Sequence, residues 1–163
     1  MRRWLNHETP WGVEYSDFFV TICCRPKGLN QLCWPEKAQE IIRTLELYHQ
    51  KHRWFCSVAL WMPDHVHLIV RPGQRERFSK LVGDFKRCLT KKIGVRWHRG
   101  FFDHRIRRHE LLEQTWKYID RNPLRAGLVQ CPKDWAYRWE PVNSGAQVMD
   151  NSKRRAGGLG TDA

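Results

Sequence analysis

Two apolar stretches separated by two turn-forming residues constrain the fold of this chain most strongly. Residues 54–62 read WFCSVALWM and residues 65–70 read HVHLIV, with Pro63 and Asp64 between them. Runs of this length that are rich in β-branched and aromatic residues and divided by a tight turn are typical of strands. We therefore expect an antiparallel β-hairpin here.

Further strand and helix patterns lie on either side of the hairpin. Residues 15–24 and 101–107 have the composition of strands, whereas residues 35–52, 78–93 and 109–122 carry apolar side chains at helical spacing. The resulting order is strand, helix, strand, strand, helix, strand, helix. This order predicts an α+β domain of the ferredoxin-like split βαβ type, with an antiparallel sheet and helices on one face. The other face would be free for a substrate.

A chain of 163 residues has the length of a single domain. We expect this domain to span residues 1–142, and residues 143–163, which are poor in apolar side chains, to form a disordered basic tail. No apolar run approaches the about 20 residues that would span a bilayer. The six cysteines include no C-x-x-C pair, so we expect reduced thiols in a cytoplasmic protein without a membrane partner.

His65 and His67 lie two residues apart in the second strand of the hairpin. Both imidazoles therefore project from one face, while Val66 and Leu68 point to the other. Two ring nitrogens on one face can bind one cation. Imidazoles also serve as ordinary surface or hydrogen-bonding groups, so the pair requires further ligands to define a metal site.

The third helix offers candidates for the remaining groups. Its apolar residues Leu112, Trp116 and Ile119 form one stripe, which leaves Tyr118 and Asn122 together on another face. The amide oxygen of Asn122 can complete a metal site, and the phenol of Tyr118 can attack phosphorus. A helix-capping asparagine before a proline and a half-buried tyrosine are the purely structural alternatives.

The charge of the chain indicates a polyanionic partner. Lys and Arg number 29 against 17 Asp and Glu, which gives a formal net charge of +12 and favours nucleic acid. Basic and aromatic side chains near the candidate site are possible DNA contacts, although each is equally explained as a solvated surface cation or a core aromatic ring. These candidate DNA-binding residues are Lys86, Arg87, Trp97, Arg105, Arg107, Lys117 and Arg121.

Two motifs in this order resemble a known family. The segments WMPDHVHLIV and WKYIDRNPLRAGLV, with RGFFDHRIR between them, are similar to the HUH single-tyrosine transposases, and specifically to the group called REP-associated tyrosine transposases. The resemblance extends from about residue 18 to residue 139. It implies that His65 and His67 are the HUH metal ligands, that Tyr118 is the nucleophile, and that Asn122 supplies a third ligand. The family often has Asn before the first histidine, where this chain has Asp64, so an extra carboxylate near the metal is possible.

The resemblance also implies an activity. A divalent cation, Mg²⁺ or Mn²⁺, would assist Tyr118 in cleaving and rejoining single-stranded or hairpin DNA of the REP type through a 5′-phosphotyrosine link, in a monomer or a homodimer. A relaxase or rolling-circle initiator nuclease is an alternative with the same chemistry. A second alternative is a non-enzymatic module that binds single strands on its open sheet face, as RNA-binding domains of this topology do.

Overall fold

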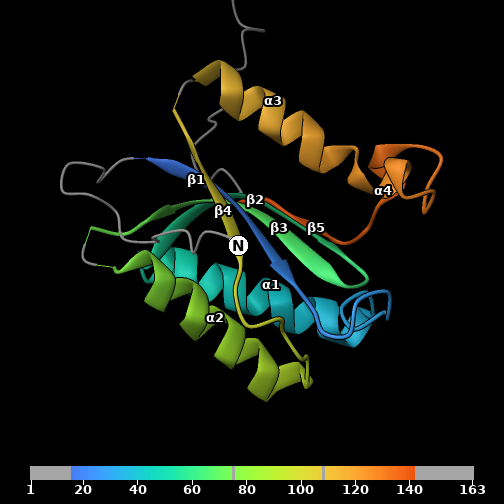
Figure 1. Cartoon of the computed structure of the whole chain (residues 1–163), viewed down its shortest axis with the longest axis horizontal. Coiled ribbons are helices and arrows are strands. Elements are labelled where there is room, and N and C mark those ends of the chain that lie inside the picture. The colour runs from blue at the N-terminus through green and yellow to red at the C-terminus, as the bar shows by residue number, and fades with distance from the viewer. Residues whose placement is uncertain (1–15, 75, 108, 142–163) are drawn as a thin grey trace, which may run out of the picture.

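The structure, a computed structural model, describes residues 16–74, 76–107 and 109–141 (Figure 1). The expected tail at 143–163 and the first 15 residues of the expected domain lie outside this part of the chain. Regular elements account for most of what is described. They are β1 Asp17–Cys23, α1 Pro35–Gln50, β2 Trp54–Met62, β3 His65–Pro72, α2 Phe78–Ile93, β4 Phe102–Ile106, α3 His109–Asp120, α4 Asn122–Arg125, the 3₁₀ turn η1 Pro132–Asp134 and β5 Arg138–Trp139.

One antiparallel sheet carries the fold, with the strand order β4-β1-β3-β2-β5. The first four strands in this order, with α1 between β1 and β2 and α2 between β3 and β4, form the split βαβ arrangement, which confirms the α+β class. The expected hairpin is also confirmed, because Met62 pairs with His65 across the Pro63 and Asp64 turn. The short strand β5, which pairs with β2, was not expected from the sequence.

The two long helices α1 and α2 cover one face of the sheet (Figure 1). The side chains of Val66, Leu68 and Val70 point to this face and join the larger core cluster. Gly94 ends α2 in the left-handed conformation, with a φ of 68°, as its position after the last apolar residue predicts. No helix in the described ranges is long and apolar enough to cross a membrane. All six cysteines are free, and three of them are buried.

The expectation that helices lie on one face only is wrong. Helix α3 crosses the opposite face of the sheet (Figure 1), where Ile119 packs with Leu60 and Ile69 in a second core cluster. The physical reason lies in β2, whose residues 58–62 are all buried. Successive side chains of a strand point to opposite faces, so an unbroken apolar run needs cover on both. The unbroken apolar run VALWM in the sequence already indicates that both faces of the sheet are covered here.

Candidate active site

His65 and His67 lie at the start of β3 and face the side of the sheet that α3 crosses, as their spacing predicts. Their ring centroids lie 4.7 Å apart. His67 is 5% exposed, and its pKa is lowered to about 3, because burial and the nearby His65 both disfavour its charged form. His67 is therefore neutral at physiological pH, which is the state that binds a metal.

Each imidazole is held through its Nδ1 atom. A hydrogen bond of 2.7 Å joins His65 Nδ1 to Asp64 Oδ1, and one of 2.9 Å joins His67 Nδ1 to the hydroxyl of Thr21. Because an ionised carboxylate only accepts, His65 carries its proton on Nδ1 and keeps a lone pair on Nε2. Partners of this kind on the far ring nitrogen are what metal-binding histidines usually have.

Asp64 has a second contact that ties the histidine to the loop after β1. Its Oδ2 atom accepts a hydrogen bond of 2.7 Å from the backbone N–H of Gly28. Burial opposes ionisation of this carboxyl, but the hydrogen bonds from Gly28 and His65 outweigh it and lower the pKa of Asp64. Asp64 is thus an anion that orients His65, and both of its oxygens already have protein partners.

Helix α3 places Tyr118 beside the histidines of the same chain. The Tyr118 ring centroid lies 6.3 Å from that of His67 and 6.0 Å from that of Phe19, whose ring it meets edge-on. The side chain is 45% exposed, so its hydroxyl is open to a substrate. The neighbouring Ile119 is buried against the sheet and fixes the direction of the tyrosine.

Asn122 is the first residue of α4, and its side chain binds the C-terminal end of α3. Its side-chain nitrogen donates to the carbonyl oxygens of Tyr118, at 2.9 Å, and of Ile119, at 3.4 Å. The capping role and the ligand role are compatible, because these bonds use the amide nitrogen and leave the side-chain oxygen for a cation. The described residues contain no group of three or more His, Cys, Asp and Glu side chains that could hold a metal ion. The two histidines fit a cation, and its remaining ligands would have to be amide, phosphate or water oxygens.

A basic hollow of about 460 Å³ lies next to the tyrosine. Its lining includes Lys117 and Arg121, which the sequence predicts as DNA contacts, and Arg125, which it does not. The guanidinium carbon of Arg125 lies 5.2 Å from the centre of the Tyr118 ring. Arg125 follows Arg121 by four residues in the motif RNPLRAG, so helical spacing alone would have placed Arg125 on this face.

The candidates Lys86, Arg87 and Trp97 line a separate hollow of about 530 Å³ between α2 and the loop that leads to β4. Lys86 donates to the carbonyl oxygens of His98, Arg99 and Gly100 at 2.8–3.2 Å. Trp97 donates its indole N–H to the carbonyl of Lys86 at 3.0 Å. Two of the three candidates therefore hold this loop in place.

Arg105 points away from the histidines. It pairs with Phe18, which faces the α1 and α2 layer, and its Nε atom donates to the Ser16 hydroxyl at 3.0 Å. Arg107 lies beyond the end of β4. Two exposed residues of β4 share the histidine face: Phe102, which pairs with Thr21 and is 58% exposed, and His104, which pairs with Phe19. Only the cross-strand register shows which face of β4 lies beside the histidines, so the sequence alone could not have predicted these neighbours.

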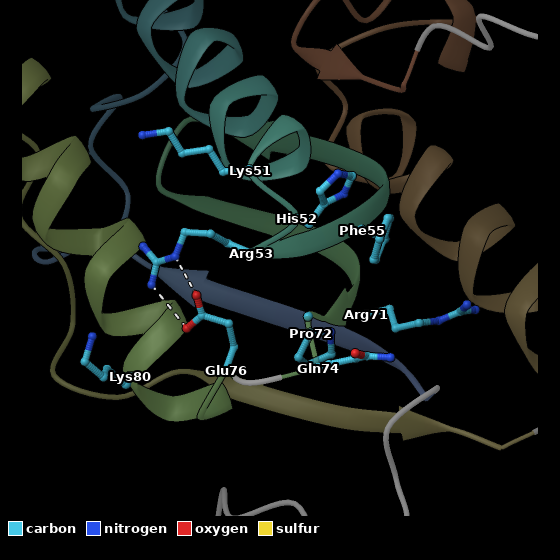
Figure 2. A pocket seen from close by; sticks show the side chains of 10 residues that line it. Lys51, His52, Arg53, Phe55, Arg71, Pro72, Gln74, Glu76 and Lys80 are labelled. Carbon is cyan, nitrogen blue, oxygen red and sulfur yellow. Dashed lines mark hydrogen bonds and ion pairs between the residues drawn. The ribbon is translucent and has the colours of Figure 1, made fainter.

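The far end of the sheet holds a larger hollow of about 810 Å³ (Figure 2). Its cations are largely neutralised by the protein itself. Arg53 contacts Glu76 at 2.6 Å and Asp84 at 2.9 Å, and Arg71 contacts Asp17 at 3.0 Å. Compared with the hollow beside Tyr118, this one offers little free positive charge to a phosphate.

Comparison with known proteins agrees with the resemblance carried by the two motifs. No family model matches the sequence. A protein of Haemophilus influenzae named "Putative REP-associated tyrosine transposase" is 31% identical, over 53% of this chain and 60% of the relative. The chain thus spans less than two thirds of that relative's length.

A solved structure supports the fold. It is that of a REP-associated tyrosine transposase bound to a REP hairpin, and it has a TM-score of 0.71 and 20% sequence identity. The match covers 85% of this chain and 82% of that one.

The sequence relative thus agrees with the resemblance to the REP-associated tyrosine transposases, and the solved structure shows that the fold is shared.

Proposed function

We propose that this protein is a DNA strand transferase that cleaves and rejoins single-stranded or hairpin DNA through a 5′-phosphotyrosine intermediate. One observation carries the proposal. An exposed tyrosine, Tyr118, packs beside His67 of the same chain, and the far nitrogens of His65 and His67 are held by Asp64 and Thr21. A candidate nucleophile and two oriented imidazoles thus lie together on the sheet face that α3 crosses.

His65 and His67 would hold a divalent cation, Mg²⁺ or Mn²⁺, with the amide oxygen of Asn122 as a candidate third ligand. When bound, the cation would polarise the scissile phosphate and neutralise the charge that develops on it. Asp64 and Thr21 keep the two imidazoles in one orientation, so that little reorganisation is needed when the cation enters.

Tyr118 supplies the covalent step. Its phenolic oxygen attacks phosphorus and loses its proton to solvent, while the bond from phosphorus to the 3′ oxygen breaks and the leaving oxygen takes up a proton. A later attack by a 3′-hydroxyl on the phosphotyrosine reverses the exchange and frees the tyrosine. One phosphodiester is formed for each one broken, so the reaction requires no ATP.

The type of DNA substrate is proposed from the relative of known structure and from the exposed rings of the site. The relative of known structure binds a REP hairpin, and we propose DNA of this type for the present chain. Phe102 offers an exposed ring on the histidine face on which an unpaired base can stack.

Because Tyr118 and His67 belong to one chain, a monomer contains the complete set of groups, although a homodimer is equally compatible with it. A cytoplasmic location gives access to DNA and keeps the thiols reduced.

The experiment that tests the proposal uses purified protein and a labelled DNA hairpin with single-stranded flanks, resolved on a denaturing gel with Mg²⁺ or Mn²⁺ and with EDTA. We expect a covalent protein–DNA band that requires the metal and is absent in Tyr118→Phe and His65→Ala. Tyr137→Phe is the matched control and should form the band as the unaltered protein does. Tight binding without a band over a range of hairpins would instead support a non-enzymatic binding module.

A further inference from the structure

We propose that Lys117, Arg121 and Arg125 form a track along α3 and α4 that binds successive backbone phosphates of a single DNA strand beside the phosphate that Tyr118 attacks. This inference rests on the proposed function, because it gives the location of the flanking strand in that reaction. It adds Arg125, to which the sequence assigns no role, and it joins three separate cations into one binding surface.

The backbone places the three side chains on consecutive helical turns. The N–H of Arg121 donates to the carbonyl of Lys117 at 3.2 Å, and the N–H of Arg125 donates to the carbonyl of Arg121 at 3.0 Å. Four residues advance an α-helix by about 6 Å, which is similar to the separation of neighbouring phosphates in an extended single strand. The short break between α3 and α4 therefore does not interrupt the row.

The charges of this row are free to bind an anion. All three side chains are exposed and line the hollow of about 460 Å³ together with Gln114 and Tyr118. None of the three forms an ion pair with another residue in the described part of the chain, and the neighbouring carboxylate of Asp120 contacts Arg138 at 2.7 Å. At the far end of the sheet, in contrast, Arg53 is matched by Glu76 and Asp84, and Arg71 by Asp17.

Arg125 connects the track to the reacting group. Its guanidinium lies over the Tyr118 ring, while His67 approaches the same ring at a centroid distance of 6.3 Å. A planar guanidinium can donate two parallel hydrogen bonds to one phosphate. A strand whose scissile phosphate lies between Tyr118 and the histidines can then place its next phosphate on Arg125.

The test measures binding of a fluorescein-labelled oligothymidine of about 12 nucleotides by fluorescence anisotropy, in EDTA so that no cleavage occurs. Arg125→Gln should bind about tenfold more weakly at low salt, and the slope of log affinity against log salt should fall by about 0.7, the value for one phosphate contact to a single strand. Arg125→Lys should keep the salt slope and recover part of the affinity, because it retains the charge but not the planar pair of donors. Lys51→Gln removes the same charge at the far end of the sheet and is the control.

Each outcome decides between the two proposals. If Arg125→Gln is folded, as shown by circular dichroism, and binds with the affinity and salt slope of the unaltered protein, the track is refuted. An equal loss in Lys51→Gln would also refute it, because the effect would then come from net charge alone. If Arg125→Gln loses binding as expected but no hairpin forms a covalent band with the unaltered protein, the track stands and the proposed strand transfer falls.

Discussion

Replacing Asp64 tests how the histidine pair is held. Asp64 accepts two hydrogen bonds of 2.7 Å, from the Nδ1 of His65 and from the backbone N–H of Gly28, one on each oxygen. An asparagine has a single acceptor oxygen, so Asp64→Asn can keep one of these bonds but not both while His65 carries its proton on Nδ1, as metal binding through Nε2 requires. Asp64→Ala loses both bonds and the negative charge beside His65.

The size of the effect follows from these contacts. Changes in the groups that orient metal-binding histidines typically lower metal affinity by about 10- to 100-fold. Asp64→Asn keeps a partner for His65 and belongs at the low end, near tenfold, whereas Asp64→Ala belongs at the high end, near 100-fold. The amide of Gly28 is exposed and can turn to water, so the free energy of unfolding should fall by only about 1 kcal/mol in either variant.

Titration calorimetry with Mn²⁺ measures the affinity directly, and urea unfolding of the metal-free protein measures the stability. Asp134→Asn, an exposed aspartate in η1, removes the same charge away from the histidines and should change neither. If Asp64→Ala bound Mn²⁺ as tightly as the unaltered protein, the contact between Asp64 and His65 would have no part in holding the cation. A large loss of stability in both variants would show instead that Asp64 mainly anchors the loop after β1.

Three further changes test other parts of the site. Thr21→Val removes the partner of the His67 Nδ1 atom at nearly constant volume, and calorimetry should show Mn²⁺ binding weakened by about tenfold; an unchanged affinity would contradict this. Phe102→Ala should weaken oligothymidine binding by anisotropy, by about fivefold or more, whereas Phe55→Ala, an exposed ring at the far end of the sheet, should not. Lys86→Met should lower the free energy of unfolding by about 1 kcal/mol in urea, because three exposed carbonyl groups lose the ammonium donor and must bond to water instead; equal stability would show that the loop is held without it.

The parts of the fold that sequence predicts well are those set by local periodicity. Helix α2 spans Phe78–Ile93 as predicted, because its apolar stripe and Gly94 both lie within the segment itself. The hairpin of β2 and β3 is set in the same way by its turn residues. His65 and His67 share a face for the same reason, since alternation along one strand decides it.

The parts that sequence predicts poorly depend on which residues become neighbours across the fold. Alternation places Arg105 and Phe102 on opposite faces of β4, but only pairing with Phe18 and Thr21 shows which face carries the histidines. Likewise, nothing near Lys86 in the sequence indicates that its ammonium meets the carbonyls of residues 98–100. Burial lowers the pKa of Lys86, which again reflects contacts far along the chain.

Helix α3 lies on the opposite face of the sheet from the one that the sequence predicted. This position explains why the candidate groups meet within one chain. If every helix lay on one face, α3 could not reach the histidines, and Tyr118 would need the surface of a second copy. The buried run in β2 requires cover on that face, and Ile119 provides it by packing against Leu60 and Ile69. Neighbouring residues on a helix point in different directions, so anchoring Ile119 in the sheet aims Tyr118 along it, toward His67. The packing that completes the core is thus the same packing that sets the position of the proposed nucleophile.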